Sequence, residues 1–226
     1  MRTWLAILAL AGVQVASASL TLDAVLQKMD AASAAVKGLK ADFEQTSFEA
    51  LVEDKSVEKG EVKVRRESPD SSEVALHFTD PYVKDVLVTG TTAQIYKPQI
   101  KTVEEYDFAK SKDSVSQALS VGFAPSGKAL REGYDAKLIG ETKIDGKPVV
   151  HLELIPKNAD SRRKFPKLEM WISTDNWQTL QQKLYQGSGG DYTLYSYSDI
   201  QINPSLKDSD FKLNLPKGVK RVNPSK

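Results

Sequence analysis

The spacing of apolar residues changes near residue 38. Before it, the apolar positions recur at or near the helical period, with charged and amide side chains between them. Thr21 is a suitable N-cap, and Gly38 stands where a helix commonly stops. We therefore expect an amphipathic helix over residues 21–37. Its apolar positions are Leu22, Val25, Leu26, Met29 and Val36.

From residue 39 the period becomes two, which is typical of β-strands. Turn-forming sequences such as Asp145-Gly146-Lys147-Pro148 and Gly187-Ser188-Gly189-Gly190 separate the alternating stretches. Short strands without intervening helices predict an antiparallel sheet, and a sheet of about 11 strands is expected to curl. The candidate strands are residues 39–48, 57–66, 73–79, 85–89, 93–97, 101–106, 134–140, 149–155, 167–173, 179–186, 192–202 and 211–215.

Within the strands, residues of one parity are mostly apolar and residues of the other are polar. One face of the sheet is therefore expected to be apolar and the other wet. We assign Tyr185, Tyr195 and Tyr197 to the wet face, where they would form cross-strand pairs. The apolar set is Val62, Val64, Val74, Leu76, Phe78, Val86, Val88, Val150, Leu152, Leu154, Leu168, Met170 and Ile172, and the polar set includes Lys63, Glu73, His77, Asp85, His151, Glu153, Lys167 and Glu169.

Residues 107–133 interrupt the alternation and fit one or two short helices with a small apolar face, including Val115 and Leu119. Such an excursion in the middle of a sheet protein is a candidate lid. Together with residues 21–37 it is a small cover for so many strands. The pattern leaves two outcomes open, an ordinary packed core or a cavity. The expected fold is mainly β with a helical lid: a strongly curved, incomplete antiparallel β-barrel covered by short helices.

The N-terminus has the features of a secretory signal peptide. Met1-Arg2 is a short positive start, residues 3–15 are mostly apolar, and Ala16-Ser17-Ala18 is a small-residue cleavage site. The apolar run of about 13 residues is shorter than the roughly 18 needed to cross a bilayer. We expect cleavage after Ala18, a periplasmic location and one mature domain over residues 19–226. A retained N-terminal anchor is the alternative.

Composition and charge exclude several classes of function. The chain has no cysteine, so neither a disulfide framework nor a lipid-modified N-terminal cysteine is possible. Residues 19–226 hold 30 Lys plus Arg against 30 Asp plus Glu, which argues against a nucleic-acid partner. The only histidines, His77 and His151, lie on polar parities, so we expect no metal and no other cofactor. Neither a G-x-S-x-G motif nor a cysteine nucleophile is present, and we expect no enzymatic activity.

Two carboxylate groups, Glu104-Glu105 and Asp208-Ser209-Asp210, are expected to be solvated. The basic run Arg162-Arg163-Lys164 falls in a loop expected from Pro156 to Pro166. It is a candidate docking patch for an acidic partner, and a solvated loop tip is the simpler alternative.

Six short segments occur in a distinctive order along the chain. They are Leu39-Lys40-Ala41-Asp42-Phe43-Glu44-Gln45, Gly60-Glu61-Val62-Lys63-Val64-Arg65-Arg66, Leu168-Glu169-Met170-Trp171-Ile172-Ser173-Thr174-Asp175, Tyr192-Thr193-Leu194-Tyr195, Tyr197-Ser198-Asp199-Ile200-Gln201-Ile202-Asn203-Pro204, and Asp210-Phe211-Lys212-Leu213. This ordered set resembles the outer-membrane lipoprotein carrier protein family (LolA-like), over nearly the whole mature chain. The resemblance implies a bent, half-open sheet closed by short helices, whose cavity receives the acyl chains of lipoproteins.

The resemblance implies a soluble periplasmic chaperone that shuttles lipoproteins from the inner to the outer membrane. Its partners would be lipoproteins, an inner-membrane lipoprotein-releasing transporter and an outer-membrane acceptor, and we expect a monomer. A periplasmic lipid- or lipoprotein-sensing regulator on the same fold is the alternative. The implied cavity residues are Phe43, Val62, Val64, Leu76, Phe78, Val86, Val88, Leu152, Leu154, Met170 and Ile172, and the implied lid residues are Leu22, Val25, Met29, Val115 and Leu119.

In the family, an arginine on an early strand bonds to the lid helices and latches them. The matching positions here are Arg65 and Arg66, and parity favours Arg66 because it shares the face of Val62 and Val64. Two features depart from the family pattern. Glu67 and Ser68 separate the arginines from a proline that often follows directly, and the bulky Trp177 occupies an expected turn.

Overall fold

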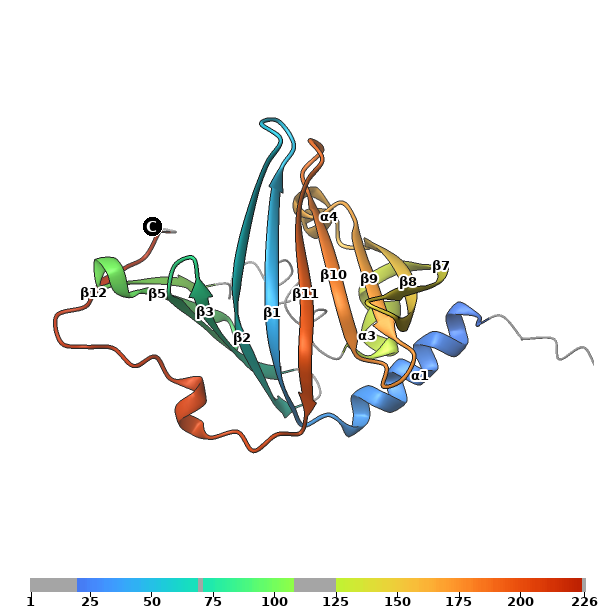
Figure 1. Ribbon diagram of the computed structural model, residues 1–226, viewed down its shortest axis with the longest axis horizontal. Helices are drawn as coiled ribbons and strands as arrows, with labels where there is room; N and C mark the ends of the chain where they lie inside the picture. Colours follow the sequence, from blue (N-terminus) through green and yellow to red (C-terminus); the bar gives the residue numbers. More distant parts are fainter. Residues whose placement is uncertain (1–19, 69–70, 108–124, 225–226) are drawn as a thin grey trace, which may run out of the picture.

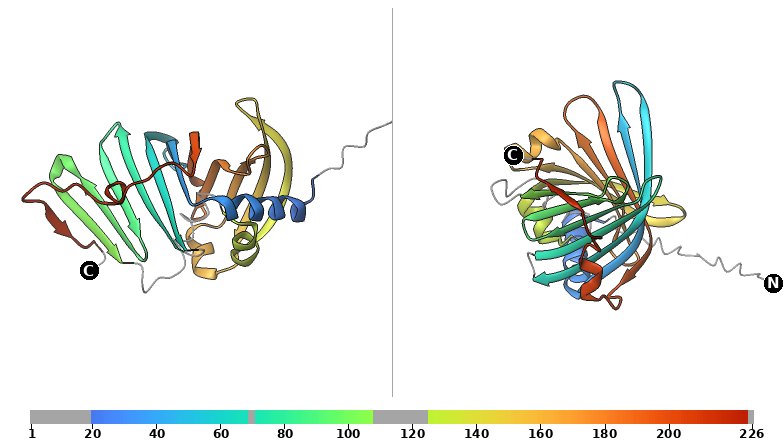
Figure 2. Two further views of the ribbon diagram at one scale, coloured as in Figure 1. Left: turned by 90° about the horizontal axis from the view of Figure 1, so that it is seen from below. Right: turned by 90° about the vertical axis from the view of Figure 1, so that its left-hand side faces the viewer.

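The computed structural model describes residues 20–68, 71–107 and 125–224. Its centre is a 12-stranded sheet in the order β12-β6-β5-β4-β3-β2-β1-β11-β10-β9-β8-β7 (Figure 1). Neighbouring strands are antiparallel except for β12, which is parallel to β6. The order does not return to its first strand, and the sheet is strongly curved (Figure 2). The expected fold class, a mainly β, incompletely closed curved sheet with short helices, is confirmed.

The strands are β1 (Gly38–Glu49), β2 (Asp54–Ser68), β3 (Ser71–Asp80), β4 (Lys84–Thr89), β5 (Thr92–Lys97), β6 (Thr102–Asp107), β7 (Tyr134–Ile144), β8 (Lys147–Pro156), β9 (Leu168–Ser173), β10 (Thr179–Gln186), β11 (Asp191–Ile202) and β12 (Lys220–Val222). The helices are α1 (Leu22–Ala35), α3 (Gly127–Gly133), α4 (Ala159–Lys164) and the 3-10 turns η1 (Pro98–Ile100) and η2 (Asp208–Phe211).

The strand expected over residues 211–215 is wrong. Phe211 ends η2, and the last strand comes later, at β12. The chain at 212–216 alternates because it lies extended over the sheet, without a ladder of its own. The loop expected over residues 156–166 contains α4, which begins after Asn158, whose Oδ1 accepts the backbone N–H groups of Asp160 and Ser161.

Helix α1 begins as expected, since Thr21 Oγ1 accepts the N–H of Ala24 at 3.2 Å. It ends at Ala35 rather than next to Gly38, which is the first residue of β1. Asn203, just past β11, holds this junction. Its Oδ1 accepts from the N–H groups of Lys37 (2.6 Å) and Gly38 (3.2 Å), and its Nδ2 donates to the carbonyl of Ala35 (2.9 Å).

The strand register joins the apolar residues of both halves of the sheet into one face, here called the inner face. Phe43 lies opposite Tyr197, and Tyr195 lies opposite Gln182. Gln182 in turn lies opposite Met170, and Met170 opposite Leu152. The assignment of Tyr195 and Tyr197 to the wet face is therefore wrong. Alternation counts tyrosine as polar, although its ring is a large apolar surface.

Two apolar clusters cover the inner face, and they are buried in different ways. The first lies between β7–β10 and the helices α1 and α3, with Met29, Leu130 and Met170 fully buried. In the part of the chain that the structure describes, all members of the second cluster belong to strands. Tyr195 packs against both clusters. The second cluster contains Leu39, Ala41, Phe43, Val62, Val64, Val74, Leu76, Phe78, Val88 and Ala93.

Helix α3 is docked tightly on α1. Asp30 of α1 accepts hydrogen bonds from the backbone N–H of Lys128 (2.7 Å) and from Arg131 Nη1 (2.9 Å). A Cβ atom on Gly127 would lie only 2.0 Å from the carbonyl oxygen of Leu26. The absence of a side chain at residue 127 therefore allows the backbones of the two helices to approach.

We predict that Gly127→Ala destabilises the protein by about 1–3 kcal/mol, because the added methyl group has to push α3 away from α1. Urea unfolding checks the change. The control is Gly189→Ala in the β10–β11 turn, where a Cβ has no neighbour within 4 Å. Equal midpoints for the two variants would contradict the close packing of α1 and α3.

Candidate functional site

The residues expected to line one acyl-chain cavity share the inner face but lie in two environments. Six of them are buried in the second cluster, and Val86 packs against it: Phe43, Val62, Val64, Leu76, Phe78, Val86 and Val88. The other four have no exposed surface and are packed beneath α1 and α3: Leu152, Leu154, Met170 and Ile172. Among the described residues, no helix residue belongs to the second cluster, whereas the first cluster includes residues of α1 and α3.

The expected lid residues of α1 all pack on the first cluster. Val25 and Met29 are fully buried, and Leu22 is partly buried. Val115 and Leu119 lie outside the described residues. Of the interruption expected at 107–133, the structure describes α3, whose Leu130 is fully buried in the first cluster.

Arg66 connects β2 with the end of α1. Its Nη1 donates to the backbone carbonyl of Ser33 at 2.6 Å, and its Nη2 donates to Ser33 Oγ at 3.1 Å. Its backbone N–H also donates to the carbonyl of Lys37 at 2.9 Å. The last turn of α1 has no basic residue of its own. The guanidinium therefore brings a positive charge to the negative end of the helix and a donor to one of its terminal carbonyls.

Arg65 points to the opposite, outer face. It donates to Glu73 Oε2 through Nε (2.8 Å) and Nη2 (2.6 Å), and to Asp208 Oδ1 through Nη1 (2.6 Å). Its guanidinium carbon is 4.5 Å from the centre of the Phe211 ring, which is buried. Arg65 thus holds η2 against the sheet, whereas Arg66 holds α1.

The C-terminal segment, residues 203–219, crosses the outer face (Figure 2). Lys63 Nζ lies 2.9 Å from Asp210 Oδ1 and 3.3 Å from Glu61 Oε1. The N–H of Lys207 and the ammonium of Lys63 lower the pKa of Asp210, and Arg65 lowers the pKa of Asp208. The expectation that these carboxylates are solvated holds for Asp208, whose side chain is 81% exposed, and is wrong for Asp210, which is 22% exposed, although both carboxylates tie the segment to β2.

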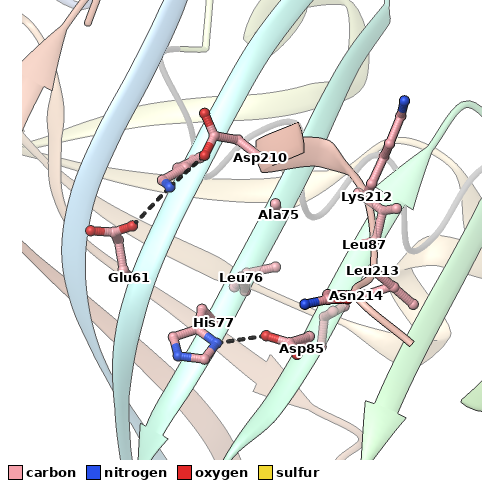
Figure 3. A pocket seen from close by; sticks show the side chains of 12 residues that line it. Glu61, Ala75, Leu76, His77, Asp85, Leu87, Asp210, Lys212, Leu213 and Asn214 are labelled. Atoms are coloured by element: carbon pink, nitrogen blue, oxygen red, sulfur yellow. Dashed lines mark hydrogen bonds and ion pairs between the residues drawn. The ribbon is translucent and has the colours of Figure 1, made fainter. Parts of the chain in front are cut away.

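A pocket of about 290 Å³ lies between this segment and β2–β4 (Figure 3). Charged groups line much of it, including Glu61, Lys63 and Asp210, and His77 Nδ1 lies 2.6 Å from Asp85 Oδ1. Leu76 and Val86 contribute to the lining, but the charged groups make the pocket unsuitable for hydrocarbon chains.

At one end of the inner face the apolar cluster gives way to a polar belt, defined as Gln45, Glu58, Lys84, Lys97 and Glu104. Glu58 accepts from Lys84 Nζ at 2.7 Å and from Gln45 Nε2 at 3.2 Å. Lys84 Nζ is also 4.1 Å from the centre of the Phe78 ring, which places it beside the second cluster. The expectation that residue 104 is simply solvated is wrong, because Glu104 accepts from Lys97 Nζ at 2.6 Å.

The belt could have been found from parity. Lys84 precedes Val86 by two residues, and Glu58 precedes Val62 by four, so both continue the apolar parity of their strands.

The belt is linked to neighbouring tyrosines. Tyr106, which packs against the second cluster, donates to Glu104 Oε2 at 3.1 Å. Lys97 lowers the pKa of Glu104, and burial raises the pKa of Tyr195 to about 12, with a smaller effect from Glu58.

The turns next to the belt carry most of the large apolar side chains that are strongly exposed in the described residues. In an antiparallel sheet the β1–β2, β3–β4 and β5–β6 turns fall on the same end, here called the rim. The rim side chains are Leu51 (95% exposed), Val52 (63%), Tyr82 (69%), Val83 (40%) and Ile100 (63%). Ile139 and Ile202 are the two remaining members of this exposed set. The rim is thus an apolar border around the polar end of the inner face.

The basic run expected as a docking patch lies in α4. Arg162 Nη1 is 3.4 Å from the carbonyl oxygen of Pro156, and Arg163 forms a solvent-exposed ion pair with Asp160 at 3.2 Å. Together with Lys164 these residues form the basic last turn of the helix, where positive charge is favourable.

Trp177, the bulky residue in an expected turn, has a left-handed backbone (φ 60°), and its ring packs against the first cluster.

The part of the chain that the structure describes contains no helix long and apolar enough to span a membrane. In the same residues, no group of three or more His, Cys, Asp or Glu side chains is arranged to hold a metal ion.

The chain is similar to several known proteins. A family model described as "-like: Uncharacterized protein" matches residues 90–202, half of the chain. The outer-membrane lipoprotein carrier protein of Methylobacillus flagellatus is 23% identical over 190 residues, which cover 81% of this chain and 86% of that protein.

Two solved structures share the fold. An uncharacterized conserved protein from Thermus thermophilus aligns with a TM-score of 0.54 at 12% identity, over 89% of this chain and 98% of that one. MucB aligns with a TM-score of 0.50 at 16% identity, over 85% of this chain and 62% of MucB. The fold defines an open, curved β-sheet protein with short helices packed on its inner face. Because the family model covers half of the chain, the chain belongs to the family that this model describes, and it is similar to the LolA-like outer-membrane lipoprotein carrier proteins.

We predict that acid releases the C-terminal segment from the outer face. The pKa values of Asp208 and Asp210 are lowered from the ordinary 3.8, so their stabilisation is complete above that pH and is lost as the pH falls through the lowered values. Methyl NMR signals of Leu206 and Leu213 should therefore stay constant from pH 7 to about 5 and change below about 3.8.

At pH 7, the double variant Asp208→Asn/Asp210→Asn should already increase amide hydrogen exchange at residues 204–214. Asp145→Asn in the β7–β8 turn is the matched control. Unchanged exchange in the double variant would show that the ion pairs do not hold the segment.

Proposed function

We propose that this protein is a periplasmic carrier that shelters the acyl chains of lipoproteins and passes them from the inner to the outer membrane. The observation that carries the proposal is the second cluster, a buried apolar layer on the inner face whose described members all come from strands. The similarity to an outer-membrane lipoprotein carrier protein supports the same conclusion. Its partners would be a lipoprotein-releasing transporter at the inner membrane and an acceptor at the outer membrane.

The energetics of acyl-chain burial limit how well a carrier can shelter its cargo. The chains of a lipoprotein contain several tens of CH₂ groups, and full burial at about 0.8 kcal/mol each would yield on the order of 30 kcal/mol. Known affinities stop near about 20 kcal/mol. A carrier that has to release its cargo without ATP must therefore shield the chains incompletely. The division of the inner face suits this need, because α1 and α3 pack on one half while the acyl chains occupy the other.

The contact between Arg66 and Ser33 provides a closing force in this proposal. Hydrogen bonds from a charged group contribute about 1.5–3 kcal/mol. Loading would break this contact as α1 shifts, and its re-formation would favour release of the cargo. Arg66 is therefore proposed as the latch, and Arg65 is assigned to the outer face.

A periplasmic sensor of lipids or lipoproteins could use the same inner face. A sensor would bind acyl chains without passing them to acceptor membranes. A transfer assay therefore separates the two functions.

The proposal is tested with a synthetic triacylated cysteine lipopeptide as cargo. We expect native mass spectrometry to show one lipopeptide bound per protein, and acceptor liposomes carrying a purified outer-membrane acceptor to remove it. Protein that stays empty at saturating lipopeptide would overturn the proposal. Protein that loads but never transfers would favour the sensor.

We predict that Arg66→Leu still loads lipopeptide but passes it on at least about fivefold more slowly, because re-closure loses its charged hydrogen bonds. Stopped-flow transfer of a fluorescent lipopeptide measures the rate. Arg65→Leu is the matched control and should transfer at close to the normal rate. A normal rate for Arg66→Leu would exclude the latch role.

We also predict that the rim takes part in cargo exchange, since exposed apolar groups at the mouth shield the chains while they move. The double variant Leu51→Ser/Val52→Ser should slow transfer several-fold and leave equilibrium loading unchanged. Ile139→Ser removes a similarly sized exposed side chain from β7 and is the control. If both variants transfer equally fast, exchange does not involve the β1–β2 turn.

A further inference from the structure

The inner face of β1–β6 changes character along the direction of its strands. One part is the apolar second cluster, which includes Val64, Val74 and Val88. The part next to the rim is the polar belt, where Lys84 lies against Phe78 of the cluster. A ligand with a hydrocarbon part and a polar end would match this arrangement if its chains followed the strands.

The charges of the belt have a definite order. The two lysines come from the neighbouring strands β4 and β5, next to the cross-strand pair Asp85 and Tyr96. The two carboxylates lie on opposite sides of the lysines: Glu104 comes from β6, next to β5, and Glu58 comes from β2, which is separated from β4 by β3. Positive charge is thus concentrated in the middle of the belt and negative charge at its sides.

Stability alone gives little reason for such pairs at this place. Ion pairs at partly exposed positions contribute little to folding, and placing them beside apolar surface adds a desolvation cost. The side chains of Lys84, Lys97 and Glu104 are 25%, 38% and 19% exposed, so the belt remains accessible from the rim. Lysine ammonium groups are common ligands of phosphate.

We propose that the polar belt binds the phosphate of a diacyl phospholipid whose chains lie on the second cluster. Lys84 and Lys97 hold the phosphate oxygens, and Glu58 and Glu104 orient the lysines in the empty protein. The inference rests on the acyl-chain binding of the proposed function, and it adds a ligand class, because the acylated cysteine of a lipoprotein carries no phosphate.

The test compares two soluble lipids with the same chains, dioctanoyl phosphatidylglycerol and dioctanoylglycerol, by isothermal titration calorimetry. Wild-type protein should bind the phospholipid at least about tenfold more tightly, as expected for charged contacts. The double variant Lys84→Met/Lys97→Met should lose this preference and keep its affinity for dioctanoylglycerol within about twofold. Lys183→Met, on the outer face beside Tyr185 and Tyr192, should keep the preference.

Other outcomes overturn the inference in distinguishable ways. Equal binding of the two lipids by wild-type protein excludes a phosphate site and leaves acyl-chain binding intact. Inorganic phosphate that binds as tightly as the phospholipid excludes a lipid-specific site. Failure to bind either lipid or the triacylated lipopeptide contradicts the proposed function itself. If circular dichroism shows that the double variant does not fold, the wild-type comparison and the single variants Lys84→Met and Lys97→Met decide the question, since each single variant should reduce the preference for the phospholipid.

Discussion

The inner face of this sheet has to be kept from water, and the rest of the structure depends on how that is done. A curved sheet cannot cover its own concave side, so other segments have to lie on it. Helices α1 and α3 do so over β7–β10, where Leu152, Met170 and Ile172 have no exposed surface. Over β1–β5, the apolar residues in the described part of the chain are contributed by strands alone. Among the described residues, the two halves of one face therefore differ in what packs on them.

The connection between these halves is a short junction with several hydrogen bonds. Asn203 binds the chain between α1 and β1, and Arg66 binds the last turn of α1 through Ser33. Asn203 donates to the carbonyl of Ala35, which lies in the last turn, where carbonyls lack intrahelical partners, whereas the Ser33 carbonyl accepts from Arg66 in addition to the N–H of Val36. The orientation of α1 over the sheet is thus set by polar contacts at one end and by apolar packing along its length.

The outer face serves a different purpose from the inner one. Two ion pairs, Lys63–Asp210 and Arg65–Asp208, attach the C-terminal segment to β2. Phe211 of this segment is buried. The neighbouring arginines 65 and 66 thus hold two different segments on two sides of one strand. The outer face is thus polar and the inner face apolar, and the polar belt and the exposed rim lie together at one end of the inner face.

Much of this architecture follows from local patterns. The period of two predicted all the long strands, the period of 3.6 predicted α1, and the shared parity of Val62, Val64 and residue 66 indicated which arginine faces inward. These features depend on side chains a few residues apart, which any strand or helix brings to the same side. The number of strands indicated that the sheet curls, and the resemblance to the LolA-like family added the proposed role of the inner face.

Only the tertiary structure decided the rest. The division of the cavity residues into two clusters, the inward position of Tyr195 and Tyr197, and the attachment of Asp208 and Asp210 depend on which strands become neighbours. Parity alone places Glu58 and Lys84 on the inner face, but the meeting of the belt residues depends on the pairing of the strands that carry them, β1, β2, β4, β5 and β6. Pairing between distant strands, and the segments that pack on them, leave no period in the chain, because their energy comes from contacts between residues that are far apart in the sequence.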